Sequence, residues 1–205
     1  MHLVYFPIAG RGELIRLIAK VGGVQGFSES AEMPEGITKA ECGSPSSTPI
    51  LIDGDLKMNE STAIEFYVAS VAPKYANLTP KQRAKDAQFC SIKESCLGLF
   101  AKHLFGDKDK DAIQAVANKY FPIIEGILPD SGFVNGLDYP TVADLAIVNI
   151  CEGYMPFGAT FKCGEIDLVK LYPKLVAHSE RTKAVADVAK ALSESTSLKA
   201  ALPGM

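Results

Sequence analysis

The pattern of apolar and polar positions changes character about a third of the way along the chain. Short β-type runs occupy residues 2–6, 50–52 and 56–58, and the last two flank the hairpin signal Asp53-Gly54. Beyond residue 80 the apolar positions recur at steps of three and four, which is the period of an α-helix. The pattern therefore predicts an α/β part followed by an all-helical part.

The α/β part contains two amphipathic segments of helical period. The first covers residues 13–20, and the second covers residues 60–72. Between the first helix and the hairpin, residues 25–47 are rich in Gly, Ser, Pro and Glu. We expect that stretch to be mostly loop, with an edge strand near Phe27 and one turn of helix near Ile37.

Two long amphipathic helices open the second part. Apolar residues repeat with a helical period over residues 89–103 and again over residues 113–128. A polar stretch with prolines at both ends, residues 73–80, precedes them and suits a linker between domains. We therefore predict an α/β domain at residues 1–73 and an all-helical domain at residues 81–205.

Shorter signals mark the helices that follow. Thr141 and Asp144 are spaced as in a capping box, with Asp in the place of the usual Glu or Gln. Pro173 stands in or near the first turn of another helix. We expect the last residues, 195–205, to be loosely ordered.

Composition and charge narrow the class of protein. The chain has 205 residues, of which 47% are apolar, enough to bury a core without covalent staples. Its net charge of −3 provides no basic field, so nucleic acid and membranes are not expected partners. No apolar stretch is long enough to span a bilayer, and the N-terminus lacks the pattern of a signal peptide.

The cysteines indicate a reducing compartment. There are five, an odd number, and no two form a C-x-x-C pair. That set argues against both a disulfide framework and a zinc site. We therefore expect a cytoplasmic protein that holds no metal.

The stretch around Thr48-Pro49 predicts a binding site for a peptide-like ligand. Proline cannot donate to a strand ladder, so Pro49 must stand at the start of the strand, often after a cis bond. The backbone groups of Thr48 then stay free to pair with a ligand as an added strand. The Ser61 hydroxyl and the helix N-terminus behind it offer donors to a carboxylate.

Five motifs occur along the chain, and they are, in order, Tyr5-Phe6, Arg11-Gly12-Glu13, Thr48-Pro49-Ile50-Leu51, Glu60-Ser61-Thr62-Ala63-Ile64 and Thr141-Val142-Ala143-Asp144. Together they resemble the cytosolic glutathione transferases, and with a later segment at residues 171–175 they cover almost the whole chain. The resemblance implies a thioredoxin-like α/β domain followed by an all-α domain, usually in a homodimer. It also implies glutathione as a co-substrate in the first domain and a hydrophobic electrophile bound between the two domains.

Tyr5 is the residue to which the resemblance assigns the chemistry. The thiolate is the nucleophile, and only a minority of a free thiol is ionised at neutral pH. A neutral tyrosine hydroxyl that donates a hydrogen bond to the sulfur stabilises the thiolate. The alternative is a half-buried strand tyrosine whose hydroxyl simply finds a partner. Residues 7–10 contain neither Ser nor Cys, which favours the tyrosine type, with a sigma-like pattern.

The resemblance also assigns contacts to the cysteinyl and γ-glutamyl units of glutathione. The backbone of Thr48 would pair with the cysteinyl unit, and Pro49 would hold the turn. Ser61 would bind the γ-glutamyl carboxylate, and Glu60 would bind its ammonium group. An ordinary helix cap is the alternative for Glu60 and Ser61, and the two interpretations are compatible.

Contacts at the other end of glutathione are less specified. Lys39 is the candidate partner of the glycyl carboxylate, and Met33 stands nearest to the place where many tyrosine-type members have a tryptophan. Arg11 is expected to be an ion-pair partner near the active site, with Glu13 as one possible mate. In this family an acidic residue of one subunit often reaches the γ-glutamyl group of the glutathione bound to the other subunit, and Glu94 is a candidate for that residue.

Three functions fit the resemblance. The first is a glutathione transferase that conjugates glutathione to hydrophobic electrophiles. The second is a glutathione-dependent isomerase or peroxidase, since it would use the same thiolate. The third is a non-catalytic glutathione- or ligand-binding relative, which the absence of tryptophan favours slightly. The electrophile pocket would be lined by Phe6, which is also expected to contact glutathione, and by Ile8, Leu99, His103 and Leu202.

Overall fold

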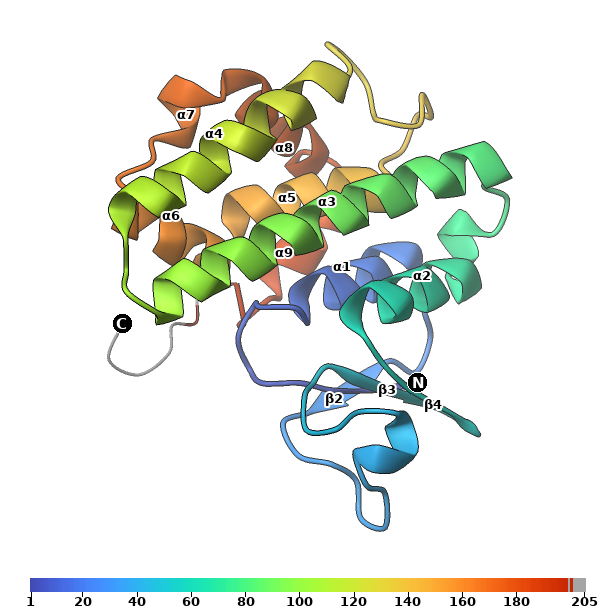
Figure 1. Ribbon diagram of the computed structural model, residues 1–205. Helices are drawn as coiled ribbons and strands as arrows, with labels where there is room; N and C mark the ends of the chain where they lie inside the picture. The colour runs from blue at the N-terminus through green and yellow to red at the C-terminus, as the bar shows by residue number, and fades with distance from the viewer. Residues whose placement is uncertain (199, 201–205) are drawn as a thin grey trace.

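A four-stranded mixed sheet forms the base of the molecule (Figure 1). The computed structural model describes residues 1–198 and residue 200. The strand order is β2-β1-β3-β4, with β1 parallel to β2 and antiparallel to β3. The predicted hairpin is confirmed, because β3 and β4 pair antiparallel around Gly54. The strands are β1 (His2–Val4), β2 (Ser28–Ser30), β3 (Ile50–Asp53) and β4 (Leu56–Asn59).

Two helices lie between this sheet and the rest of the chain (Figure 1). They are α1 (Glu13–Gly22) and α2 (Ser61–Val71), and both were predicted. Every residue of α1 except Lys20 is buried, because α1 contacts the helices of the second part as well as α2. Single turns of 3₁₀ helix occur at η1 (Ala40–Cys42) and η2 (Pro73–Tyr75).

The second part of the chain is all-helical, so the predicted fold class is confirmed. The two long predicted helices are present. Helices α6, α7 and α9 were not predicted, because each has at most eight residues, too few to show a helical period of apolar positions. No helix within the described residues is long and apolar enough to cross a membrane. The helices are α3 (Pro80–Phe105), α4 (Lys110–Ile127), α5 (Val142–Glu152), α6 (Ala159–Cys163), α7 (Leu168–Leu171), α8 (Pro173–Lys183) and α9 (Ala186–Ser193), with an irregular π-type turn η3 (Tyr154–Gly158).

The connection between the two parts lies where the prolines indicated. Helix α2 ends at Val71, η2 follows, and α3 begins at Pro80. Helix α3 then contacts α2, while α1 contacts both α5 and α9, so the two parts pack directly against one another. The domain boundaries 1–73 and 81–205 stay a prediction.

The predicted capping box starts α5 in the middle of a buried polar network. Asp144 Oδ2 accepts a hydrogen bond from the Thr141 N–H at 2.8 Å, and its Oδ1 pairs with His178 Nε2 at 2.7 Å. The Thr141 hydroxyl donates to Asp86 Oδ1 at 2.6 Å, which joins the start of α5 to α3. This network joins α5 to both α3 and α8.

The C-terminal tail corrects the expectation of loose order, as far as residue 198. Ser195 and Ser197 both donate hydrogen bonds to the buried carboxylate of Glu13, and Leu198 is buried. No local pattern predicts this contact, because the acceptor lies 182 residues away, at the start of α1.

Asp86→Asn tests the buried carboxyl of the polar network. Burial raises the pKa of Asp86 from its ordinary value of 3.8 to about 6, against the opposing hydrogen bonds from Thr141 and Ala143. A raised folded pKa gives stability that is complete below the unfolded pKa and is lost as the pH rises through the folded pKa. The stability of wild type relative to the variant should therefore fall by about 2–3 kcal/mol between roughly pH 4 and pH 7.

Urea denaturation of both proteins at the two pH values measures that difference. Asn keeps an acceptor for the Thr141 hydroxyl but does not titrate. Any pH dependence that remains in the variant therefore comes from other groups, and the difference between the two proteins reports Asp86 alone. A stability difference that stays constant with pH would contradict the raised pKa.

Candidate functional site

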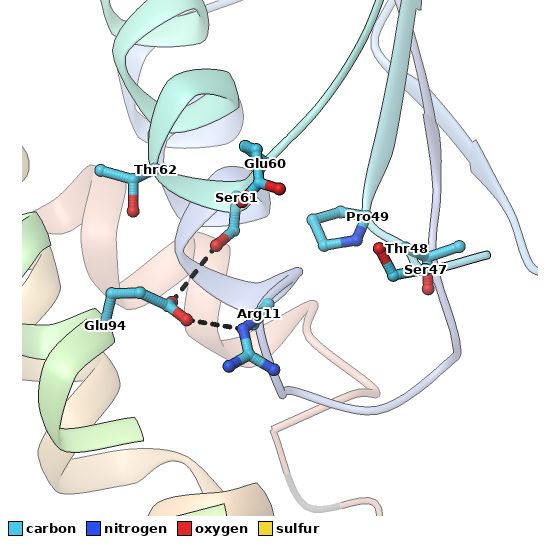
Figure 2. A pocket seen from close by; sticks show the side chains of 8 residues that line it. All are labelled: Arg11, Ser47, Thr48, Pro49, Glu60, Ser61, Thr62 and Glu94. Atoms are coloured by element: carbon cyan, nitrogen blue, oxygen red, sulfur yellow. Dashed lines mark hydrogen bonds and ion pairs between the residues drawn. The ribbon is translucent and has the colours of Figure 1, made fainter. Parts of the chain in front are cut away.

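A polar cavity of about 250 Å³ opens between the two parts of the chain (Figure 2). Its residues come from the loop after β1, the turn before β3, the N-terminus of α2 and the middle of α3. It therefore draws on segments that are far apart in the sequence. They are Arg11, Ser47, Thr48, Pro49, Glu60, Ser61, Thr62 and Glu94.

The turn at Thr48-Pro49 forms one wall of this cavity. The Thr48–Pro49 bond is cis, Pro49 is buried, and β3 begins at the next residue. In the described part of the chain, the amide and carbonyl of Thr48 take part in no backbone hydrogen bond. They are therefore available to a ligand that pairs as an added strand.

The N-terminus of α2 forms a second wall. Glu60 is the N-cap residue at φ 72°, and its side chain does not cap the helix. The first hydrogen bond of the helix is donated by Ile64, so the N–H groups of Ser61, Thr62 and Ala63 have no helical partner. Unpaired N–H groups at the positive end of a helix favour an anion.

Glu94 connects the remaining walls (Figure 2). Its carboxylate accepts hydrogen bonds from Arg11 Nε at 2.6 Å and from the Ser61 hydroxyl at 3.2 Å. Glu94 thus faces the cavity of its own chain, whereas the sequence offered it as a contact to a partner subunit. Arg11 is an ion-pair partner as expected, but its mate is Glu94, because Glu13 pairs with Arg16 at 3.3 Å.

Tyr5 lies directly after β1 and is 8% exposed. Its hydroxyl oxygen accepts a hydrogen bond from the Arg11 N–H at 2.9 Å. Burial raises the pKa of Tyr5, although this N–H and the charges of Arg11 and Arg16 oppose the effect. The hydroxyl therefore keeps its proton at neutral pH, and with its oxygen already accepting, that proton is free for a ligand.

Two glycines make room for the Tyr5 ring. A Cβ atom at Gly10 would lie 2.2 Å from the Tyr5 hydroxyl, and one at Gly12 would lie 2.4 Å from the ring. Gly10 also has a φ of +43°, which side chains rarely adopt. This role was not predicted from the sequence for either glycine.

A smaller apolar recess of about 70 Å³ lies on the other side of Arg11. Arg11 lines both the polar cavity and this recess, and Tyr5 lines the recess. The site is therefore bipartite, with the tyrosine hydroxyl near the junction. The recess is lined by Tyr5, Ile8, Gly10, Arg11, Leu97, Ala101, Phe105, Met155 and Pro156.

The predicted electrophile residues are only partly in this recess. Ile8 lines it, but Leu99 packs against the main core and His103 lies beside Asp107. Leu97 and Ala101 line it in their place, because α3 is apolar on more than one face and the period alone did not select the right one. Leu202 lies outside the described residues.

Three predicted glutathione contacts do not line the polar cavity. Met33 packs against the small cluster around Val4 and Ile50, and Lys39 Nζ donates to the Ser46 carbonyl at 2.9 Å. Phe6 is 54% exposed, with its ring edge-on to Tyr5 at 5.7 Å. Within the described residues, no cluster of His, Cys, Asp and Glu could hold a metal ion.

Comparison with known proteins agrees with this architecture. Residues 95–195 match the family model described as glutathione S-transferase, C-terminal domain. A glutathione S-transferase of Antechinus stuartii is 30% identical over 143 residues, which are 64% of this chain. The match spans 62% of that relative, less than two thirds of its length.

Solved structures match over nearly the whole chain. A Caenorhabditis elegans glutathione S-transferase has a TM-score of 0.71 at 27% identity, covering 95% of this chain and 97% of that one. A delta-class glutathione transferase of Nilaparvata lugens has a TM-score of 0.69 at 28% identity, covering 92% and 91%. Residues 95–195 therefore resemble the C-terminal domain of glutathione S-transferases, and the chain has the glutathione S-transferase fold over nearly its whole length.

Gly10→Ala tests how tightly the loop holds Tyr5. The new methyl group would overlap the Tyr5 hydroxyl and would sit at a positive φ, so we expect a loss of about 1–3 kcal/mol in the free energy of unfolding. Gly126→Ala is the matched control, because Gly126 is inside α4 with open space around it. That control should stabilise by about 0.5–1 kcal/mol.

Urea denaturation of both variants measures the two effects. Equal stability of the Gly10→Ala variant and wild type would show that Tyr5 is not confined by the loop.

Proposed function

We propose that this protein is a glutathione transferase that activates the thiolate of glutathione for attack on hydrophobic electrophiles. The observation that carries the proposal is the Tyr5 hydroxyl, which is buried, keeps its proton and has its oxygen filled by the Arg11 N–H. Such a group can donate its proton to an incoming ligand. A thiolate at that point would be the charged form that the hydrogen bond favours.

The walls of the polar cavity suit the remaining parts of glutathione. The free backbone groups of Thr48 would pair with the cysteinyl unit. The α2 N-terminus and Ser61 would take the γ-glutamyl carboxylate, and the carboxylates of Glu94 and Glu60 would take its ammonium group. With both ends of the γ-glutamyl unit fixed, the sulfur would lie toward Tyr5.

Arg11 contributes in two ways. Its backbone N–H orients the Tyr5 hydroxyl, and its side chain neutralises part of the charge of Glu94. Because Arg11 lines both cavities, its guanidinium would lie close to a thiolate formed between them. A nearby positive charge lowers the pKa of a thiol.

The reaction then follows from the two cavities. The glutathione thiol loses its proton to solvent, and the sulfur lone pair attacks the electrophilic carbon held at the recess. A C–S bond forms, and with an aryl halide the C–halogen bond breaks and halide leaves with its electron pair. The apolar walls of the recess favour a hydrophobic second substrate.

A glutathione-dependent isomerase or peroxidase would use the same thiolate, and a binding relative would lack its activation. The sigma-like tyrosine type predicted from the sequence rests on Tyr5.

The cysteines support a reducing, cytoplasmic setting for the protein. There are five, an odd number, and all of them are free thiols.

A homodimer is part of the proposal. An open apolar cavity of about 470 Å³ lies on α2, α3 and the start of α5, and none of its lining residues lines the polar cavity or the recess. Phe66 at its edge is 39% exposed, and Val71 on the same helix is 45% exposed. A second copy of the chain would cover this surface.

Sedimentation equilibrium at micromolar concentration tests the dimer. We expect about twice the mass of the chain for wild type and a shift toward monomer for Phe66→Lys, because a buried unpaired ammonium is costly. Val169→Lys, a change at an exposed residue of α7, is the control and should leave the mass unchanged. A monomeric wild type would remove the dimer from the proposal.

Tyr5→Phe tests the chemistry. A hydrogen bond to a charged group contributes about 1.5–3 kcal/mol, so turnover with an aryl halide should fall about 10- to 100-fold. Glutathione affinity, measured by calorimetry, should change little. Tyr67→Phe is the matched control, because the Tyr67 hydroxyl bonds to Asp53 outside both cavities. Unchanged turnover in Tyr5→Phe would remove Tyr5 from the mechanism.

A further inference from the structure

A second polar contact joins α2 to α3 beneath the polar cavity. Lys93 Nζ lies 2.6 Å from Glu65 Oε1, and the two side chains are 1% and 0% exposed. They are charged groups of the interior, and neither lines the cavity. The proposed chemistry makes no use of either.

The positions of the two contacts are related. Ser61 and Glu65 are four residues apart on α2 and so lie on the same face of that helix. Lys93 and Glu94 are consecutive on α3. The helices are thus joined by two adjacent contacts, Ser61 to Glu94 at the cavity and Glu65 to Lys93 one turn deeper.

A third contact connects these two. Lys93 Nζ lies 3.4 Å from Glu94 Oε2, the same oxygen that accepts from the Ser61 hydroxyl. Burial acts to lower the pKa of Lys93, but the charges of Glu65 and Glu94 outweigh it and raise that pKa. Lys93 therefore stays charged and holds Glu94 from below, while Arg11 holds it from the side.

Stability alone is a poor explanation for such a pair. Removing two charges from water is costly, and replacing a buried pair with apolar residues is often neutral or stabilising. Glu65 Oε2 is buried and, among the described residues, has no hydrogen-bond partner, which adds to that cost. A pair retained at this cost is better explained by the alignment that it imposes on the two helices.

We propose that the Glu65–Lys93 pair is a positioning device that keeps Glu94 opposite Ser61 and so makes the cavity selective for a ligand with an α-ammonium group. The inference rests on the proposed function for the identity of that ligand. When the ligand binds, its ammonium group replaces the Ser61 hydroxyl as a donor to Glu94. The freed hydroxyl then turns to the ligand carboxylate. Both exchanges require Glu94 to stay where Lys93 holds it.

The test compares glutathione with its des-amino analogue, glutaryl-cysteinylglycine, by titration calorimetry. The variant is Glu65→Leu combined with Lys93→Met, which removes one charge of each sign and keeps the buried volume apolar. Wild type should bind glutathione more tightly than the analogue. In the double variant the ratio of the two dissociation constants should fall at least about fivefold, with turnover at saturating glutathione changed less than about threefold.

Two further proteins complete the test. Asp187→Leu with Lys74→Met removes another ion pair between the two parts of the chain, at 2.9 Å and outside the cavity, and should leave the ratio unchanged. Glu65→Gln covers the case in which the double variant fails to fold. It keeps a neutral acceptor for Lys93, but the Lys93 ammonium group is then paired with the charge of Glu94 alone. Glu94 is less available to the ammonium group of the ligand, so the ratio of the two dissociation constants should again fall severalfold.

The outcomes separate the two claims. A wild type that does not bind glutathione overturns the proposed function and this inference with it. A wild type that binds and discriminates, with folded Glu65 and Lys93 variants that keep the wild-type ratio, overturns only the inference and leaves the pair a structural contact.

Discussion

The ion pair between Arg11 and Glu94 is the contact on which the site depends. It joins residues 83 positions apart, one on the loop after β1 and the other on α3. The same arginine bonds through its backbone to the Tyr5 hydroxyl, and the same carboxylate accepts from Ser61. The polar cavity, the tyrosine and the apolar recess are therefore held in one arrangement by a single pair.

The loop that carries Arg11 is itself held by a buried arginine. Arg16 on α1 donates to the carbonyl oxygens of Phe6 and Ile8 and pairs with Glu13, which in turn binds the C-terminal tail. This network lies behind Tyr5, with the Arg16 guanidinium 5.7 Å from its ring. Helix α1, which follows the loop, packs against α2 on one side and against α5 and α9 of the second part of the chain.

Much of this could be predicted from the sequence. The strands, the hairpin, α1, α2 and the long helices follow from local periodicity. The free backbone of Thr48 beside Pro49 was expected because proline has no N–H to donate to a strand ladder. What local patterns miss are pairings between distant segments. The bonds of Glu94 with Arg11, of Lys93 with Glu65 and of the tail with Glu13 exist only once the helices are packed. The face of α3 that lines the recess is hidden for the same reason.

The central claim is that Tyr5 stabilises the thiolate of bound glutathione. Titration of the ultraviolet absorbance of the thiolate in the complex measures this directly, with Tyr5→Phe beside wild type. We expect a thiol pKa at least about one unit below that of free glutathione in wild type, and a return toward the free value in the variant. Bound glutathione whose thiol titrates at the free value in wild type would contradict it.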